Sequence, residues 1–215
     1  MPKIENIFNF DATSVIAQDV DLVGEVTIGA NCIIHPSCTI VALGPIIFGS
    51  GCIVEEQSVI CNRYVVSELN ERKTRMEIGE GNLFSVGCRV EASRIGSWNV
   101  FEGKSRVSVD VVIGNHCVIG AGCTVVYEPV LGSFLDGPAP LPPPGGDSDE
   151  SGGGKSIVVM GGERRVADYS VVFGEGSNLS SWSGEGSGQA KALHAKHLLY
   201  LAETLPKFHR TRSTH

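Results

Sequence analysis

Large apolar residues recur along the N-terminal half of the chain with a period of six. Ile16, Leu22, Ile28, Ile34 and Ile40 follow one another at this spacing. An amphipathic helix would repeat every 3.6 residues and a half-buried strand every two, so neither explains the pattern. The spacing instead indicates a repeat architecture.

The six-residue frame continues well beyond this first stretch. A glycine or an acidic residue often follows a frame position, and a second small residue recurs four places after it. This is the hexapeptide pattern of a parallel β-helix, in which three segments close one triangular coil of roughly eighteen residues. The later frame positions are Phe48, Val54, Ile60, Ile78, Phe84, Val90, Ile95, Phe101, Val107, Ile113, Ile119 and Val125.

Stacking the frame three to a coil predicts three columns of inward-facing side chains. We therefore expect an all-β protein of about five to six triangular coils, followed by one α-helix. The first column contains Ile16, Ile34, Val54, Phe84, Phe101 and Ile119. The second contains Leu22, Ile40, Ile60, Val90, Val107 and Val125, and the third contains Ile28, Phe48, Ile78, Ile95 and Ile113.

Every departure from the spacing of six lies on the step from the second column to the third. The longest departures follow Ile60 and Val125. Extra chain should therefore leave the stack at one corner. Such a corner either marks a binding face or is simply where the stack tolerates insertions, and the sequence leaves both interpretations open.

The pattern divides the chain into four parts. Residues 1–130 and 157–173 form the β-helix, with Ile157–Gly161 expected as the third-column strand of the last coil. Residues 131–156 are rich in Pro, Gly, Ser and acid, which predicts a disordered insertion. Residues 174–188 are expected to be a Gly/Ser linker, and residues 189–205 an amphipathic helix that stops before Pro206. That helix packs on the flank of the β-helix or on a partner.

Composition narrows the functional classes. The formal net charge of −7 and the pI near 5.4, without a basic patch before the last residues, argue against nucleic acid as a partner. The N-terminus lacks an apolar signal region, and no long apolar run occurs, so we expect a soluble intracellular protein without membrane insertion. Six of the seven cysteines occupy the small inward positions, where they are expected to act as core filler.

Two enzyme classes use hexapeptide β-helices, and the chain carries neither signature in full. When the zinc sites of γ-class carbonic anhydrases are aligned by the frame, their ligand positions become Cys61, Val86 and Glu91. Valine cannot coordinate zinc, so we expect no metal and no cofactor. An acyltransferase would need a base histidine, for which His35 and His116 are the candidates.

Several motifs together resemble one family in particular. They include the run from Gly24 to Gly29, Ile34-His35-Pro36, Val54-Glu55-Glu56-Gln57-Ser58, the run from Asn99 to Lys104, and Leu205-Pro206-Lys207-Phe208. These runs are similar to the dynactin subunit 6 family, within the γ-carbonic-anhydrase-like superfamily. The resemblance implies a left-handed β-helix and a non-catalytic structural subunit of the dynactin pointed-end complex, in the cytoplasm and on the cytoskeleton. That role supports dynein-driven microtubule transport and the binding of cargoes and adaptors.

The resemblance also implies particular partners. They are the sibling β-helix subunit dynactin subunit 5, the pointed-end actin-related protein and the large zinc-containing pointed-end subunit. Candidate interface residues are Trp98, Glu55, Glu56, Arg63, Arg72 and Arg75. Trp98 either anchors a partner or covers the flank beneath the terminal helix. The alternative function is that of a divergent hexapeptide enzyme, a carbonic anhydrase or acyltransferase homologue acting as a homotrimer.

Overall fold

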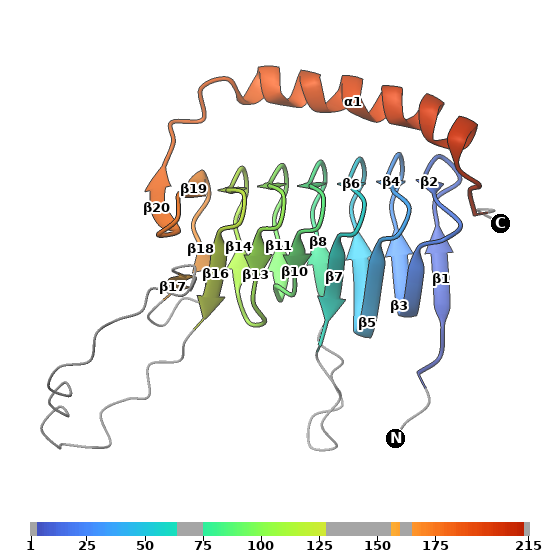
Figure 1. Ribbon diagram of the computed structural model, residues 1–215, viewed down its shortest axis with the longest axis horizontal. Coiled ribbons are helices and arrows are strands. Elements are labelled where there is room, and N and C mark those ends of the chain that lie inside the picture. Colours follow the sequence, from blue (N-terminus) through green and yellow to red (C-terminus); the bar gives the residue numbers. More distant parts are fainter. Residues whose placement is uncertain (1–3, 64–74, 128–155, 160–164, 213–215) are drawn as a thin grey trace, which may run out of the picture.

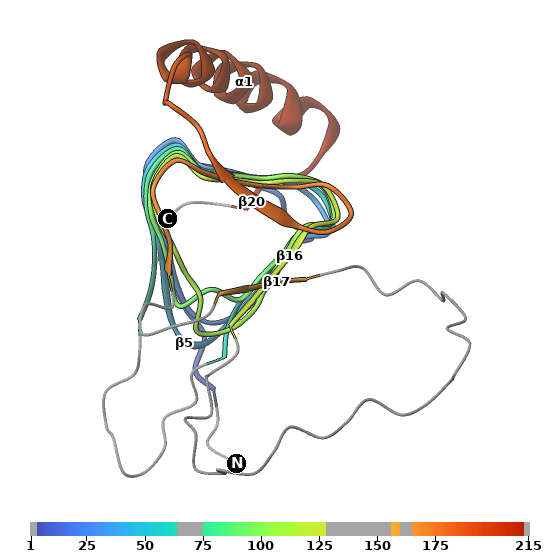
Figure 2. The ribbon, with the colours of Figure 1, turned by 90° about the vertical axis from the view of Figure 1, so that its left-hand side faces the viewer.

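The protein is a parallel β-helix with a triangular cross-section, closed along one side by a single long helix (Figures 1 and 2). This computed structural model describes residues 4–63, 75–127, 156–159 and 165–212. Short strands on each side of the triangle pair in parallel with the strands of the coils before and after them. The predicted β-helix of about six coils is therefore confirmed. The coils wind left-handed, as the resemblance implies (Figure 2).

The strands form three columns that follow the chain in turn. The first column consists of β2 (Val15–Ile16), β4 (Ile33–Ile34), β6 (Ile53–Val54), β9 (Leu83–Phe84), β12 (Val100–Phe101), β15 (Val118–Ile119) and β19 (Ser170–Phe173). The second consists of β3 (Asp21–Ile28), β5 (Thr39–Phe48), β7 (Val59–Asn62), β10 (Arg89–Val90), β13 (Arg106–Val107), β16 (Thr124–Tyr127) and β17 (Ser156–Val159). The third consists of β1 (Ile7–Phe10), the later halves of β3 and β5, β8 (Met76–Ile78), β11 (Arg94–Ile95), β14 (Val112–Ile113) and β18 (Arg165–Val166).

The register of these strands confirms the three columns of inward-facing residues predicted from the sequence. In the first column, Val54 pairs with Phe84, Phe84 with Phe101, and Phe101 with Ile119. Every frame residue is at most 8% exposed. The phenyl rings of Phe84 and Phe101 stack with centroids 4.8 Å apart and planes 2° apart, and both side chains are fully buried.

The corner between the second and third columns is where coils differ in length. Strand β5 continues through this corner without a break. It has two more residues there than its partner β3, and they form a bulge next to Gly24. Gly24 has a φ of +86°, and a Cβ there would lie 1.9 Å from the Ala42 carbonyl oxygen, so glycine is required. The described ends of both long insertions, Arg63 and Tyr127, also lie at this corner, whereas 64–74 and 128–155 lie outside the described residues.

Small polar side chains complete the interior at the corner between the third and first columns. The buried Asn82 amide donates to the Gly79 and Gly96 carbonyl oxygens, and its own oxygen accepts from the backbone and side chain of Asn99. The Asn99 side-chain oxygen in turn accepts from the Cys117 backbone. This ladder satisfies buried polar groups from coil to coil. All seven cysteines are buried and free, in agreement with their expected role as core filler.

The last coil differs from the prediction in one respect. Strand β17 pairs with β16, with Ile157 opposite Val125, so it extends the second column and is not the expected third-column strand. The third-column strand is β18, in which Val166 pairs with Ile113. The frame then continues to Val172 in β19, six residues later. A long insertion hides this register from the sequence, because either strand could follow it.

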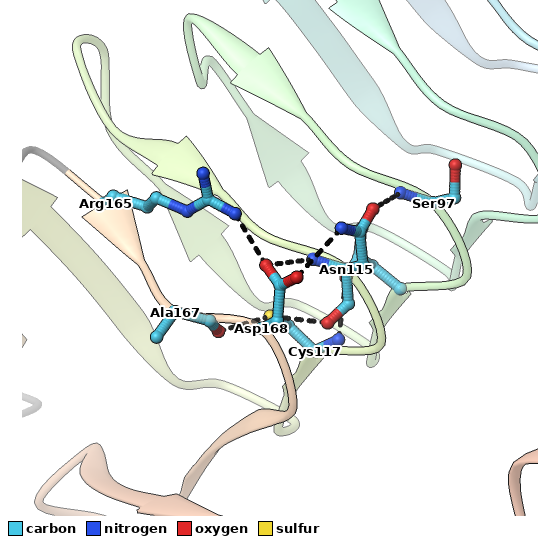
Figure 3. Close-up of polar contacts among 7 residues, drawn as sticks. Ser97, Asn115, Cys117, Arg165, Ala167 and Asp168 are labelled. Atoms are coloured by element: carbon cyan, nitrogen blue, oxygen red, sulfur yellow. Dashed lines mark hydrogen bonds and ion pairs between the residues drawn. The ribbon is translucent and has the colours of Figure 1, made fainter. Parts of the chain in front are cut away.

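Asp168 ties this last coil to the stack (Figure 3). Its carboxylate accepts hydrogen bonds from the Asn115 backbone and side-chain nitrogens at 3.1 and 3.0 Å, and it pairs with Arg165 at 2.6 Å. The Asn115 side-chain oxygen accepts from the Ser97 backbone, so the contact continues into the preceding coil. These hydrogen bonds, followed by the Arg165 guanidinium, lower the pKa of the Asp168 carboxyl.

The chain after β19 is more ordered than a Gly/Ser linker. Within residues 174–188, strand β20 (Asn178–Ser181) pairs antiparallel with β19. The Trp182 indole then donates to the His116 carbonyl oxygen at 2.9 Å. The linker expectation was therefore incomplete, because pairing with an edge strand stabilises this polar segment without needing an apolar face.

Helix α1 (Ser187–Phe208) lies along the outside of the first column and returns toward the first coil (Figure 1). Leu201 and Leu205 are buried against Ile33 and Ile53, so packing on the β-helix flank is confirmed. The helix is longer than predicted: it begins two residues earlier, after Gly186, and includes Pro206. Pro206 has no N–H to donate to the carbonyl oxygen four residues earlier, so it removes one hydrogen bond from the last turn, and the helix ends two residues later. No helix among the described residues has the length and apolarity needed to cross a membrane.

The stacked phenyl pair predicts a large loss of stability on truncation. We expect Phe84→Ala to lower the free energy of unfolding by about 3–5 kcal/mol, because it opens a cavity in a fully buried column. Denaturant unfolding measures this. The matched control is Phe173→Ala, at a residue that is 48% exposed, which should change stability by less than about 1 kcal/mol. Equal effects of both variants would contradict this packing.

The Asp168 contacts predict a pH-dependent stability. We expect Asp168→Ala to cost about 1 kcal/mol at neutral pH, since the carboxylate accepts charge-assisted hydrogen bonds in a partly exposed place. Because the folded pKa is lowered, this contribution is present above the unfolded pKa of about 3.9 and is lost as the pH falls through the folded value. The difference in melting temperature between variant and parent should therefore shrink in acid. Asp21→Ala, at an exposed second-column position, is the control and should show no such difference.

Candidate functional site

Trp98 lies beneath the terminal helix, in the position that one of the two interpretations from the sequence expects. It has a φ of +62° at the corner between the third and first columns, and its ring covers Gly81 of the coil before. A Cβ at position 81 would lie 2.5 Å from that ring, so only glycine fits there. On the helix, the His194 ring meets Trp98 edge-on at 5.8 Å, and the Lys191 ammonium lies 4.6 Å from the Trp98 ring centroid.

Glu55 and Glu56, the two acids of the predicted interface, form hydrogen bonds and ion pairs with neighbouring coils. The Glu55 carboxylate accepts a hydrogen bond from the Val86 backbone in the next coil at 3.1 Å. The Glu56 carboxylate lies 2.8 Å from Nδ1 of His35 in the coil before. Burial acts to raise the pKa of Glu56, but the hydrogen bond from His35 and further contacts outweigh it and lower that pKa. Both acids therefore hold neighbouring coils together at the corner after the first column.

The arginines of the predicted interface lie apart from this acidic pair. Arg63 makes a two-pronged ion pair with Glu91, at 2.7 and 2.9 Å, and Arg89 joins the same carboxylate at 2.6 Å. Arg75 is 3.9 Å from Glu77, and Arg72 lies outside the described residues. The structure therefore places the five described residues of the predicted interface at three corners of the prism and does not bring them together.

The three aligned zinc-ligand positions are also divided. Cys61 and Glu91 each follow a paired frame residue, since Ile60 lies opposite Val90, and they are neighbours in space. Val86 lies at a different corner and its side chain is 44% exposed. Within the described part of the chain no three His, Cys, Asp or Glu side chains gather as a metal site would require. The residues present do not fit the zinc of the carbonic anhydrases.

The two candidate base histidines have different surroundings. His35 is 8% exposed, is oriented by Glu56 through Nδ1, and its Nε2 has no hydrogen-bond partner. His116 stacks on Tyr169 with centroids 4.9 Å apart, and burial lowers its pKa. A carboxylate-oriented histidine is the arrangement of a general base, but His35 is buried, which limits the access of a substrate to its ring.

A groove beneath α1 is the feature that sequence reasoning missed. The helix and the outer face of β9, β12 and β15 enclose a cavity of about 590 Å³, which we call the helix groove. Its floor is Leu83, Val100 and Val118, which directly precede frame residues and so point outward. Apolar residues at these outward positions, in three successive coils, were the signal available in the sequence.

The buried thiols predict low chemical reactivity. Burial raises the pKa of Cys38 to about 12 and that of Cys88 to about 11, and it also raises the pKa of Cys61. A hydrogen bond with Cys52 lowers the pKa of Cys32, but that side chain is fully buried, so lack of access limits its reaction. Because the thiolate is the reactive form, we expect an aromatic disulfide reagent at pH 8 to label the native protein slowly and the denatured protein at all seven sites. Absorbance of the released thiol measures both rates. Fast labelling of the native protein would contradict the burial of these side chains.

Comparison with known proteins identifies relatives by sequence and by fold. The chain is 42% identical to dynactin subunit 6 of Nematostella vectensis over 121 residues, which cover 54% of this chain and 66% of that protein. It is 37% identical to dynactin subunit 6 of Danio rerio, covering 53% and 61%, and 37% identical to that of Dictyostelium discoideum, covering 52% and 57%. The chain thus matches somewhat under two thirds of the length of these relatives. No family model matches.

A solved structure supports the fold alone. A putative acetyltransferase from Bacillus cereus superposes with a TM-score of 0.52 and 15% identity, covering 93% of this chain and 92% of that one. At this identity the likeness concerns architecture and carries no activity with it. The sequence matches are more specific, because they recur in animals and an amoeba at 37–42% identity. The resemblance inferred from the motifs is confirmed: this chain is a β-helical relative of dynactin subunit 6.

Proposed function

We propose that this protein is a non-catalytic structural subunit of a dynactin pointed-end complex. The observation that carries the proposal is the similarity to dynactin subunit 6 from three distant organisms. The division of the aligned zinc positions between two corners agrees with it. In this role the protein acts in the cytoplasm, on the cytoskeleton, and supports dynein-driven transport and the binding of cargoes and adaptors. It needs no cofactor.

The proposed partners are dynactin subunit 5, the pointed-end actin-related protein and the large zinc-containing subunit. The N-terminal end of the stack offers a docking surface for such a partner. Strand β1 is the outermost strand of the third column, and its Phe8 and Phe10 rings stack at 5.9 Å beside an open hollow of about 1000 Å³. The neighbouring β2 edge is instead covered by the C-terminal tail, where Arg212 donates to the Ile16 carbonyl oxygen. An edge strand left open beside apolar rings favours pairing with another chain.

Affinity purification tests this proposal. We expect the tagged full chain, expressed in its own cells, to recover actin-related filament subunits and a second β-helical chain in a very large particle. Ile7→Asp should reduce that recovery at least tenfold, because Ile7 is an exposed residue of β1 and the substitution places a charge on the proposed docking surface. Phe173→Asp, at the opposite end of the stack, is the matched control and should leave recovery unchanged.

Recovery as a lone homotrimer would overturn the proposal and favour the alternative, a divergent hexapeptide enzyme. One observation supports that alternative, namely the orientation of His35 by Glu56 with Nε2 left unpartnered. In that case His35→Gln should abolish acyl transfer by the purified trimer, while the midpoint of thermal unfolding stays near that of the parent.

A further inference from the structure

The helix groove lies where α1 bridges the middle coils. The C-terminal half of α1 packs tightly on the first column through Leu201 and Leu205. Toward the start of the helix, contact becomes local: His194 Nε2 donates to the Gly51 carbonyl oxygen at 2.7 Å, and Lys191 lies over Trp98. The cavity of about 590 Å³ remains between these contacts and the sheet, within the size range of small-molecule sites.

The floor of the helix groove is apolar and straight. Val100 pairs with both Leu83 and Val118, so the three side chains form a row along the stack with the parallel-strand spacing of about 4.8 Å. The backbone beneath them is already paired within the sheet. Trp98 and Trp182 line the groove as well. An apolar floor in which three side chains form a straight row suits a linear aliphatic chain.

The charge of the groove is opposite to that of the whole protein. Its lining includes Lys191, Lys196 and three histidines, and none of its lining residues is Asp or Glu. The chain as a whole carries a formal net charge of −7. Two carboxylates lie near the lining residues without lining the groove: Glu80 accepts a hydrogen bond from the Trp98 indole at 3.2 Å, and Asp168 acts electrostatically on His116. A ligand with an anionic head near Lys191 therefore meets complementary charge.

We propose that the helix groove binds a linear amphiphile with an anionic head, of the class of long-chain fatty acids. The alkyl chain lies along Leu83, Val100 and Val118 beneath α1, and its carboxylate pairs with Lys191 at the rim. A peptide fits less well, because its backbone N–H and C=O groups would face aliphatic side chains that offer no hydrogen-bond partner. This inference does not depend on membership of dynactin.

The two tryptophans make binding directly measurable, because they are the only ones in the chain and both line the groove. The probe is sodium dodecanoate, added to the full-length protein below the concentration at which it forms micelles. We expect a saturable change in tryptophan fluorescence with one site per chain. A ligand that binds the folded state also raises the melting temperature, whereas a detergent that unfolds the protein lowers it.

Two related probes test the assigned head group. Dodecanol and dodecyltrimethylammonium share the alkyl chain but are neutral and cationic. Each should bind at least tenfold more weakly than dodecanoate. Lys191→Met should remove this preference, while Lys207→Met, in the last turn of α1 and outside the groove, should retain it. Equal affinity for all three probes would overturn the assignment of an anionic head.

A matched pair of variants tests the location. Val118→Asp places a carboxylate on the groove floor, whereas Val112→Asp changes the same residue type in the same coil, at an outward position of another column. We expect the first variant to lose dodecanoate binding at least tenfold and the second to retain it, with both showing a cooperative thermal transition. Binding that survives Val118→Asp, or no fluorescence change with the parent protein, would overturn the proposal. Failure here would leave the purification result unaffected, so the two proposals can be judged separately.

Discussion

Parallel pairing between successive coils is the constraint on which the rest of this structure depends. Most strands contain two residues, far too few to be stable alone, and each is fixed by the strands of the coils on either side. Each coil thus takes its register from its neighbour, and one frame residue on each side of the triangle faces inward. The corners of successive coils are stacked in the same way, and there Asn82, Asn99 and Asp168 form hydrogen bonds from one coil to the next. Function on such a scaffold is left to the outer faces, the corners and the two ends.

Much of this fold could be predicted from the six-residue frame, because a buried aliphatic at every sixth position has few structural alternatives. The three columns agree with the strand register as far as Val125. Prediction failed where the frame was interrupted: after the insertion, Ile157 pairs with Val125 and the third column resumes only at Val166. An insertion removes the spacing that carries the register, so the strand that follows could belong to either side of the triangle. The end of α1 was misplaced because Pro206 was taken as a stop signal, whereas the helix tolerates the loss of that one hydrogen bond and continues to Phe208.

The candidate site was less predictable than the fold. Of the interface residues proposed from the sequence, the acids and Arg63 form hydrogen bonds and ion pairs between neighbouring coils, and among the five that the structure describes Trp98 is the one that lines the helix groove. The pairing of His35 with Glu56 and of Arg63 with Glu91 depends on residues 21 and 28 positions apart, which no local spacing reveals. The helix groove depends on where α1 docks. Its floor was visible in the sequence only as three outward apolar residues, which on their own are ordinary surface positions.

The course of α1 and its tail changes how this solenoid should respond to stress. A linear array of repeats frays from its ends, and each end does so independently of the other. Here the chain leaves the last coil, runs back along the first column and pairs with the first coil, where Thr211 bridges to Ala17. The two ends of the array are thereby joined through one helix, so the first coil is held by residues that follow the last coil in the chain. Unfolding from either end must first detach the same helix and tail, so the two ends of the stack should unfold together and not independently.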